Sequence, residues 1–394
     1  MNGTRDDRVR LVSLVEAETV TGPMKPLLMF TRNIQSPRED SIAISHSAVT
    51  TVRAPRQRPL STNSFLRAAE DAGLQIELLR ERFLFDWSIL PQLADYLAAR
   101  RPHIVETHDV KSHFIIWLLK SYNKSLDVRW VAFHHGYTRT STRVLMYQQL
   151  DRLSLRAADR VVTVCNPFVR QLVQRGVDPG KITILANAIQ ERTRTPDFEL
   201  LCLRRRLGLQ PTDRIILSVG RLSPEKGHET LIAAYRQLKA NGGVPGLRLV
   251  LVGDGGDAQR LKESAADLGS EVLFTGHVDD PWPYYCLADA FVLPSHSEGS
   301  PLALFEAMSA ALPIVASAVG GVPETLRDGV SAVLVSAGSD CELASALEHV
   351  LGDVDFANKL GRGAHAAVEK FSPERYTRER LMIYEGLLRR PMRY

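Results

Sequence analysis

The chain has 394 residues, of which 44% are hydrophobic and 24% charged, a composition that is ordinary for a soluble globular protein of two or three domains. Its longest strongly apolar run, residues 114–119, is far too short to span a membrane, and no apolar signal-peptide core follows the charged N-terminus, so we expect a cytoplasmic protein. The four cysteines are widely spaced and form no Cys-x-x-Cys pair, which argues against a zinc site or a disulfide framework and predicts small core residues.

Charge is distributed unevenly along the chain. Residues 1–190 hold 26 Lys and Arg against 18 Asp and Glu, whereas residues 191–394 hold 23 against 27. A basic N-terminal half suits an anionic partner such as a membrane surface, although an Arg-rich surface without a partner explains the count equally well. No basic run is interleaved with aromatic residues, so we do not expect nucleic acid as a partner.

The first half of the chain alternates apolar stretches with amphipathic ones. We expect strands at residues 10–16, 41–52, 75–79, 103–107, 129–133, 161–164 and 182–185. We expect helices at residues 24–32, 65–72, 89–100, 111–120, 147–157 and 168–175. Residues 188–211 then interrupt this rhythm with a polar, charged stretch that contains Pro196, which predicts a domain boundary.

The alternation restarts after this boundary. Strands are expected at residues 214–219, 247–252, 271–274, 290–293, 313–316 and 332–335, and helices at 228–240, 258–268, from about 301, 340–350, 355–370 and 374–389. Strands that alternate with helices at this spacing predict parallel sheets covered on both faces. The fold class is therefore α/β, with two doubly wound, Rossmann-like domains and a ligand cleft between them.

Two glutamates lie on either side of an expected helix start. Glu298 follows a short apolar strand, and Glu306 lies nearly two turns into the next helix. Between them, Gly299-Ser300-Pro301 forms a helix N-terminus in which Ser can cap and Pro fits the first turn. The free N–H groups there predict a site for a phosphorylated sugar ligand, and the alternative is a capped helix with two exposed glutamates.

Cations and a histidine occur at other strand ends. Arg221 and Lys226 flank a Ser-Pro turn after a strand, where they could neutralise a diphosphate leaving group or simply form a solvated surface pair. His135 precedes Gly136 at a strand end and could donate a hydrogen bond to a sugar or phosphate, unless it is a core histidine. Glu306 could bind ribose hydroxyls, because a carboxylate accepts two hydrogen bonds at once.

Several common site types do not fit the sequence. The Gly253-Asp254-Gly255-Gly256 turn does not match the dinucleotide fingerprint G-x-G-x-x-G, and no clear ribose-binding acid ends the next strand. The chain contains neither a phosphate-binding G-x-x-x-x-G-K-[ST] loop nor a G-x-S-x-G nucleophile elbow. Dinucleotide oxidoreductases, P-loop kinases and α/β-hydrolases are therefore not expected.

Taken together, the strand-end motifs resemble the retaining family-4 glycosyltransferases of GT-B fold, over roughly residues 10–390. Five motifs of the second half occur in the family's order and spacing: Gly220-Arg221-Leu222-x-x-Glu225-Lys226-Gly227, Gly253-Asp254-Gly255, Thr275-Gly276-His277-Val278, Glu298 and Glu306 with seven residues between them, and Gly320-Gly321-Val322-Pro323-Glu324. In the first half, His135-Gly136 and Ile184-Leu185-x-Asn187 match more loosely.

The resemblance implies a domain plan. Residues 1–188 would form the acceptor-side domain and residues 189–372 the nucleotide-sugar-binding domain. The last helix, residues 373–394, would cross back to pack on the first domain.

The resemblance also implies a role for each matched residue. It places Arg221 and Lys226 on the donor diphosphate, Leu302 near the phosphates, Glu306 on the ribose and Val278 on the base. Glu298, with the backbone at Gly299, Ser300 and Pro301, would hold the donor sugar, and His135 would approach that sugar from the first domain. Gly22 would line the phosphate side of the cleft, and Gly220 belongs to the donor-binding residues. Three positions depart from the family pattern. Gly22 is followed by Pro23 where paired glycines are usual, Gly299-Ser300-Pro301 replaces Gly-Phe-Gly, and Ala188 follows Asn187 where Gly is common.

The implied activity is transfer of a sugar from a nucleotide-diphosphate sugar to an acceptor hydroxyl with retention of configuration, as in a hexosyltransferase. No cofactor or metal is expected, because two cations and helix N–H groups would replace it. The acceptor would be a sugar or a lipid-linked molecule of surface polysaccharide or glycolipid assembly, with the basic first domain in peripheral contact with the inner face of the membrane. Two alternatives remain open, a GT-B nucleotide-sugar epimerase and a non-catalytic nucleotide-sugar-binding protein.

Overall fold

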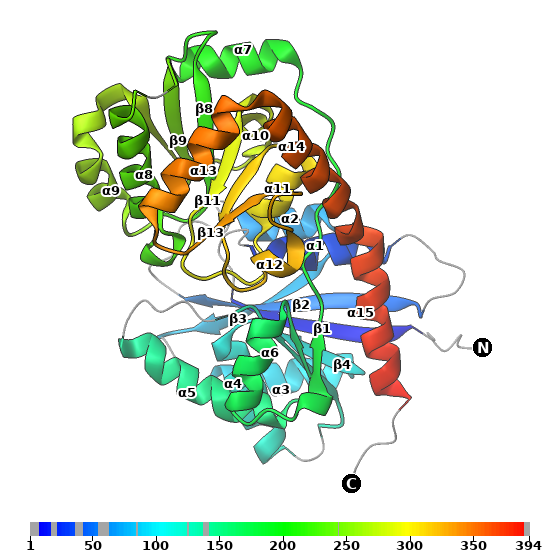
Figure 1. Cartoon of the computed structure of the whole chain (residues 1–394). Helices are drawn as coiled ribbons and strands as arrows, with labels where there is room; N and C mark the ends of the chain where they lie inside the picture. The colour runs from blue at the N-terminus through cyan, green and yellow to red at the C-terminus, as the bar shows by residue number, and fades with distance from the viewer. Residues whose placement is uncertain are drawn as a thin grey trace. The chain divides into compact units, whose positions relative to one another are not determined.

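The computed structural model describes residues 8–16, 22–35, 42–53, 63–83, 86–123, 126–136, 142–242 and 244–389. The chain divides into two compact units (Figure 1). Unit 1 falls within residues 1–187 and 373–394, and unit 2 comprises residues 188–372.

Unit 1 is built on a fully parallel sheet with the strand order β3-β2-β1-β4-β5-β6-β7. Its strands are β1 (Val9–Val15), β2 (Ile44–Arg53), β3 (Gln75–Glu81), β4 (Ile104–Thr107), β5 (Arg129–His134), β6 (Arg160–Thr163) and β7 (Ile182–Ile184). Its helices are α1 (Met24–Asn33), α2 (Ser64–Asp71), α3 (Ile89–Arg100), α4 (Val110–Tyr122), α5 (Thr142–Ala157), α6 (Asn166–Gln174) and α15 (Pro373–Leu388). The α5 helix begins five residues earlier than its predicted start.

Two apolar clusters cover the two faces of this sheet. One cluster joins α3, α4, α5 and α6 to one face through residues such as Leu93, Ile116 and Leu172. The other joins α1 and α2 to the opposite face through Leu27, Phe65 and others. The C-terminal helix α15 packs beside α1 within the same unit (Figure 1).

Unit 2 repeats the design with the strand order β10-β9-β8-β11-β12-β13, again fully parallel. Its strands are β8 (Arg214–Val219), β9 (Leu247–Val252), β10 (Val272–Gly276), β11 (Ala290–Leu293), β12 (Ile314–Ser317) and β13 (Val333–Val335). Its helices are α7 (Asp197–Arg206), α8 (His228–Ala240), α9 (Ala258–Ser264), α10 (Trp282–Leu287), α11 (Leu302–Ser309), α12 (Val322–Thr325), α13 (Asp340–Gly352) and α14 (Val354–Val368). Both units are thus doubly wound and Rossmann-like, as the alternating pattern predicts.

The chain divides between residues 187 and 188, at the start of the stretch 188–211 that the sequence predicts as a domain boundary. This stretch also contains α7, which was not predicted. The helix buries Leu200 and Leu203, which are three residues apart and therefore share one face. Acidic residues occupy its first turn and arginines its last turn, which suits the helix dipole. These signals are present in the sequence, but the surrounding charge obscures them.

The predicted burial of all four cysteines is also wrong. None of the four forms a disulfide bond, and Cys202 and Cys341 are exposed whereas only Cys165 is fully buried. Cys202 lies on the outer side of α7 and Cys341 in the first turn of α13, so neither faces the core of unit 2.

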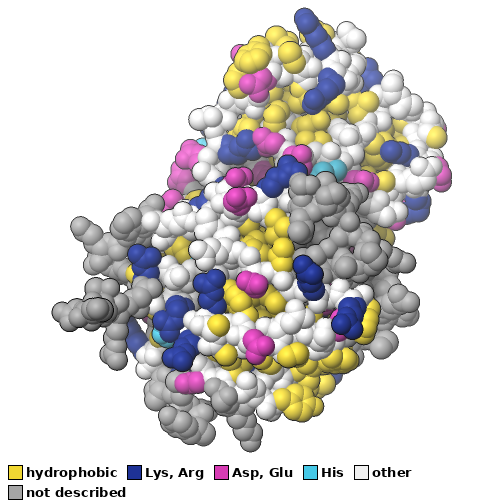
Figure 2. Space-filling view, turned by 180° about the vertical axis from the view of Figure 1, so that it is seen from behind, with side chains coloured by type: hydrophobic (Ala, Val, Ile, Leu, Met, Phe, Trp, Pro, Cys, Tyr) yellow, Lys and Arg dark blue, Asp and Glu magenta, His cyan; other side chains and the backbone are white. Residues whose placement is uncertain are grey.

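Two features concern contact with a membrane: the charged side chains on the surface, and the length and hydropathy of the helices. Figure 2 shows one face of the molecule, on which Lys and Arg side chains of unit 1 lie among acidic and apolar ones. No helix in the described ranges is both long enough and apolar enough to span a membrane. Peripheral membrane contact of the basic half stays a prediction.

Candidate functional site

The strand order of unit 2 brings two of the predicted site loops together. The order reverses between β8 and β11, which are neighbours in the sheet. Residues 220–227 follow β8, and residues 294–301 follow β11. In doubly wound sheets, ligands bind beyond the carboxyl ends of the strands at such a reversal. The Arg-Lys motif and the two-glutamate motif therefore lie at one edge of the same sheet.

Two glycines allow these loops to pack closely. Gly227 has a φ of 66°, and a Cβ there would lie 2.1 Å from the carbonyl oxygen of Pro294. Gly320, in the loop after β12, has a φ of 55°, and a Cβ there would lie 1.6 Å from the carbonyl oxygen of Glu298. Any side chain at either position would push the backbone of the β11 loop away.

Gly220 makes a similar close contact with the loop after β9. Its backbone N–H donates to the carbonyl of Val252 at 2.9 Å, which extends the strand pairing by one residue. A Cβ on Gly253 would lie 1.9 Å from the carbonyl oxygen of Gly220. The turn at Gly253, which follows β9, therefore packs against the loop at Gly220. As noted from the sequence, this turn does not match the dinucleotide-binding fingerprint.

A buried carboxylate joins the two main loops. The Nζ atom of Lys226 lies 2.7 Å from Oε1 of Glu298, and the hydroxyl of Ser295 donates to the same oxygen at 2.7 Å. The Glu298 side chain is 6% exposed, whereas that of Lys226 is 25% exposed. The pair therefore fixes the Lys226 ammonium at the edge of the sheet while leaving part of it open to solvent.

Arg221 provides a second cation on the same loop. It directly follows Gly220, and its side chain is exposed. No carboxylate of the described chain lies within salt-bridge distance of its guanidinium, in contrast to Lys226. Arg221 is thus available to an anionic ligand without breaking an existing ion pair.

The second glutamate has a buried hydrogen-bond donor that the sequence did not reveal. Glu306 is the fifth residue of α11, just over one turn into the helix, and it is 9% exposed. The hydroxyl of Tyr285, on α10, donates to its Oε2 at 2.9 Å. Burial, together with the nearby Glu306 carboxylate, raises the pKa of Tyr285 well above its usual value. The tyrosine therefore stays a hydrogen-bond donor and orients one oxygen of Glu306.

The start of α11 differs from the prediction. The helix begins at Leu302, and Pro301 is its N-cap, with a φ of −74° and a ψ of 119°. Because Pro301 and not Ser300 is the N-cap, the predicted N-cap at Ser300 and the predicted placement of Pro301 in the first turn are wrong. Gly299 and Ser300 are half-buried in the loop before the helix. The N-terminus of α11 follows the loop that carries Glu298, and its use as an anion-binding site stays a prediction.

Val278, the predicted base contact, follows β10. It is half-buried and packs against the apolar cluster that contains α10 and α11. Its position at the same edge of the sheet is compatible with its predicted role, which stays a prediction.

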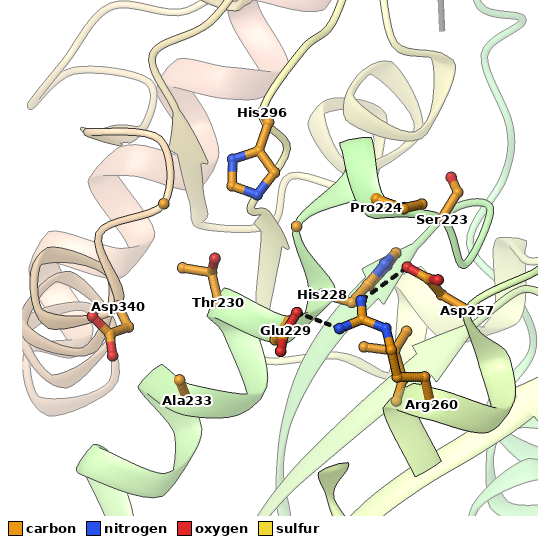
Figure 3. A pocket seen from close by; sticks show the side chains of 13 residues that line it. Ser223, Pro224, His228, Glu229, Thr230, Ala233, Asp257, Arg260, His296 and Asp340 are labelled. Atoms are coloured by element: carbon orange, nitrogen blue, oxygen red, sulfur yellow. Dashed lines mark hydrogen bonds and ion pairs between the residues drawn. The ribbon is translucent and has the colours of Figure 1, made fainter. Parts of the chain in front are cut away.

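A pocket of about 480 Å³ opens beside this edge, at the N-terminus of α8 (Figure 3). Its charged lining consists of Glu229, Asp257, Asp340 and Arg260, and none of the predicted diphosphate ligands lines it. Arg260 is held by Glu229 at 2.6 Å and by Asp257 at 3.0 Å (Figure 3). Three carboxylates against one paired guanidinium do not suit a diphosphate, so this pocket does not replace the loops after β8 and β11 as the candidate site.

The two predicted site residues of unit 1 lie at the corresponding edge of its own sheet. Gly22 is exposed and lies two residues before α1. His135 directly follows β5, is half-buried, and its ring lies near those of His108 and Phe133. Whether these residues meet a ligand bound to unit 2 across an interdomain cleft stays a prediction.

The next feature is the arrangement of side chains that could bind a metal ion. Across the described ranges, no group of three or more His, Cys, Asp or Glu side chains is arranged to hold a metal ion. The expectation of metal-independent chemistry stays a prediction, since a bound diphosphate would itself supply ligands to a metal.

Two family models match the chain in succession. The model described as glycosyl transferases group 1 matches residues 203–366, and the model described as glycosyl transferase 4-like domain matches residues 35–188. The first match contains every predicted site residue of unit 2, and the second contains His135.

The chain is similar to two bacterial enzymes that are both named D-inositol 3-phosphate glycosyltransferase. It is 33% identical to that of Acidothermus cellulolyticus over 246 residues, which is 59% of this chain and 54% of that protein. It is 33% identical to that of Nocardia farcinica over 225 residues, which is 55% of this chain and 50% of that protein. The chain thus spans about half the length of the curated relatives it matches.

Solved structures share the fold over nearly the whole chain. Anabaena HepE in complex with UDP-glucose has a TM-score of 0.80 at 18% identity, covering 96% of this chain and 100% of that one. Sucrose-phosphate synthase from Thermosynechococcus elongatus has a TM-score of 0.75 at 20% identity, covering 96% of this chain and 99% of that one. At such identities the likeness concerns the fold alone.

Proposed function

The chain belongs to the group 1 glycosyl transferases, with two Rossmann-like domains of the GT-B type, and on that premise we propose that it transfers a sugar from a nucleotide-diphosphate sugar to an acceptor hydroxyl. The observation that carries this proposal is the Lys226–Glu298 pair, which joins the two loops at the strand-order reversal of unit 2. A cation anchored by a buried carboxylate, with the exposed Arg221 on the same loop, is a suitable receptor for a diphosphate.

The donor residues divide by chemistry. Arg221 and Lys226 would hold the diphosphate, and the N-terminus of α11 would add backbone N–H groups and a favourable dipole. Glu306, oriented by the Tyr285 hydroxyl, would accept hydrogen bonds from the two ribose hydroxyls. Glu298 would contact the donor sugar with its second oxygen, since Oε1 already accepts from Lys226 and Ser295.

We propose a uridine diphosphate sugar as the donor class to test first. A structural neighbour, Anabaena HepE, was solved with UDP-glucose, and the site residues proposed here require only a diphosphate, a ribose and a hexose. For the acceptor, the relatives named for D-inositol 3-phosphate make that compound the first candidate, beside sugar or lipid-linked acceptors of surface polysaccharide and glycolipid assembly.

The proposed chemistry retains the anomeric configuration by front-face attack. The departing diphosphate is stabilised by Arg221 and Lys226, and one of its oxygens takes the proton of the attacking acceptor hydroxyl. The C1–oxygen bond to the diphosphate breaks as the bond from C1 to the acceptor oxygen forms on the same face. Two cations and helix N–H groups stabilise the charge that develops, so no metal is needed.

The activity is tested by incubating the purified protein with UDP-glucose and each acceptor, and measuring both the glycosylated product and the released UDP. Arg221→Ala and Lys226→Ala should each lower transfer about 100-fold while the protein stays folded. The matched control is Lys262→Ala, which removes an exposed lysine from α9. Full transfer by both site variants would refute the diphosphate role, and loss of transfer on chelation would refute metal independence. An α-linked product from an α-linked donor, identified by NMR, would establish retention.

Two other functions give different outcomes in the same assay. A GT-B nucleotide-sugar epimerase would change the sugar of the donor without an acceptor and keep the nucleotide attached. A non-catalytic nucleotide-sugar-binding protein would bind the donor and release no UDP with any acceptor. The retained set of two cations and two carboxylates favours the transferase over the binding protein.

A further inference from the structure

Arg192 is fixed against the start of α10 in unit 2. Its Nη1 and Nη2 atoms donate to the two carboxylate oxygens of Asp280, at 2.5 and 2.8 Å. Its guanidinium carbon also lies 5.3 Å from the centre of the Trp282 ring. The bidentate pair fixes one edge of the planar guanidinium, and Trp282 covers one of its faces. Because the Arg192 side chain is still 43% exposed, its opposite face remains accessible.

The support behind Arg192 is itself anchored. Trp282 is 5% exposed, and its indole N–H donates to the backbone carbonyl of Thr193 at 2.8 Å. The backbone N–H of Trp282 donates to Oδ1 of Asp280 at 3.2 Å. These contacts hold the segment that carries Arg192 against α10, so the guanidinium keeps one orientation.

Arg192 lies beside the nucleoside end of the candidate donor site. Asp280, its partner, follows the predicted base contact Val278 by two residues. The centroid of the Trp282 ring lies 6.4 Å from that of the tyrosine that donates to Glu306. The hydrogen bond with Asp280 raises the pKa of Arg192, and the charges of Asp280 and Glu306 raise it further, against the effect of partial burial. Arg192 is therefore within electrostatic reach of the carboxylate that is proposed to bind the ribose.

The accessible face of Arg192 suits a flat ligand better than an anion. Asp280 already offsets the positive charge, so the group offers a fixed plane more than a free cation. A guanidinium plane stacks on nucleobases, and every base presents such a face. Among the parts of a nucleotide sugar, only the base is flat and aromatic.

We propose that Arg192 is the stacking surface for the nucleobase of the sugar donor. The base would lie against the accessible face of the guanidinium, with the ribose hydroxyls on Glu306. The proposal rests on the proposed function, because it requires that a nucleotide binds at this edge of unit 2. It assigns a donor-binding role to a residue outside the matched motifs.

Calorimetry with UDP and with inorganic pyrophosphate tests the contact. Arg192→Ala should weaken UDP binding about five- to thirtyfold, the loss expected for a guanidinium–ring contact. Pyrophosphate has no base, so its affinity, measured by competition with UDP, should not change. Arg192→Lys keeps the charge but loses the plane, so it should bind UDP nearly as weakly as Arg192→Ala.

The matched control is Arg194→Ala. It removes another exposed arginine of the same segment, which pairs with Asp197 at 3.5 Å, and it should bind UDP as the wild type does. Since Arg192→Ala and Arg194→Ala each break only an exposed ion pair, their thermal unfolding should be nearly that of the wild type.

The outcomes separate this contact from the proposed function. Wild-type UDP affinity in Arg192→Ala or in Arg192→Lys would overturn the stacking role, while weaker UDP binding by Arg221→Ala would still support the diphosphate site. An equal loss of UDP and pyrophosphate affinity in Arg192→Ala would also overturn it, because the substitution would then act on the diphosphate loops. A wild-type protein that binds neither ligand would refute the proposed function, and this contact with it.

Discussion

The ammonium of Lys226 and the carboxylate of Glu298 lie 2.7 Å apart, although 72 residues separate them in the chain. The contact joins the loop after β8 to the loop after β11, where the strand order of unit 2 reverses. Glu298 is almost fully buried, and its position depends on close packing by the loop after β12. Several consequences of this arrangement can be measured.

Gly320→Ala should displace the backbone of Glu298. A Cβ at this position would lie 1.6 Å from the Glu298 carbonyl oxygen, and the φ of 55° is unfavourable for alanine. We expect a loss of about 1–3 kcal/mol in the free energy of unfolding and a large loss of transfer, measured by urea unfolding and by initial rates. Gly352→Ala is the matched control, because nothing lies within 4 Å of its Cβ and its φ is not positive. Equal effects of the two substitutions would contradict the proposed contact.

Tyr285→Phe should weaken nucleotide binding without unfolding the protein. The substitution removes only the hydroxyl that donates to Glu306, so the carboxylate loses its orientation but keeps its charge. We expect UDP to bind several-fold more weakly and the free energy of unfolding to fall by about 1 kcal/mol. The neighbouring Tyr284→Phe, also on α10, serves as the control. UDP affinity that is unchanged in Tyr285→Phe would argue against a ribose role for Glu306.

Arg380→Met should destabilise unit 1 strongly. Arg380 and Glu106 are both fully buried, and Glu106 also accepts hydrogen bonds from Ser13 and Tyr384. Removing the guanidinium leaves a buried carboxylate without its counter-charge, which costs about 3–5 kcal/mol. Arg375→Met, which breaks an exposed pair with Glu379 on the same helix, should cost less than about 1 kcal/mol. Thermal unfolding that is the same in both variants would show that the buried pair does not anchor α15.

Stability should be greatest near neutral pH. Burial lowers the pKa of His46 from 6.5 to about 3 and that of His134 to about 4, and it also lowers the pKa of His135. These groups take up protons in the unfolded chain near pH 6.5 but not in the folded one, so stability should fall between pH 6.5 and 4 by up to about 1.4 kcal/mol per pH unit for each. His113 behaves in the opposite way. Burial lowers its pKa, but the Asp151 carboxylate outweighs burial and raises the pKa overall. The protonated His113 therefore stabilises the fold at low pH, and this stabilisation is lost as the pH rises through the raised pKa.

Urea unfolding at several pH values tests this dependence. The midpoint should move to lower urea concentration from pH 6.5 to pH 5, a range in which Glu106, with its lowered pKa, stays ionised. A protein that is more stable at pH 5 than at pH 6.5 would show that the buried histidines are not neutral in the folded state.

The overall architecture could be predicted from the sequence because it depends on local patterns. Short apolar strands alternate with amphipathic helices, and each of the predicted strands lies within a few residues of its observed position. The α7 helix was missed because its apolar face is reduced to Leu200 and Leu203 within a charged stretch. The N-cap at Pro301 was misplaced by one residue, since a Ser-Pro pair can start a helix in either register.

The composition of the site could be predicted, but its internal contacts could not. The positions of Lys226 and Glu298 at strand ends follow from the alternation of strands and helices. Their direct ion pair depends on the path of two loops, which close packing at Gly227 and Gly320 determines. The Tyr285 contact depends on how α10 packs against α11, and no local pattern encodes it.

The central claim is that the loops after β8 and β11 of unit 2 bind the diphosphate of a nucleotide sugar. Its most direct test is the UDP dissociation constant, measured by calorimetry for the wild type, Arg221→Ala, Lys226→Ala and Arg260→Ala. We predict that each of the first two variants binds UDP at least about tenfold more weakly, as expected for loss of a charge-assisted contact. Arg260→Ala, which alters the acidic pocket at α8, should bind UDP as the wild type does. Wild-type affinity in both Arg221→Ala and Lys226→Ala, or loss of affinity only in Arg260→Ala, would contradict the claim.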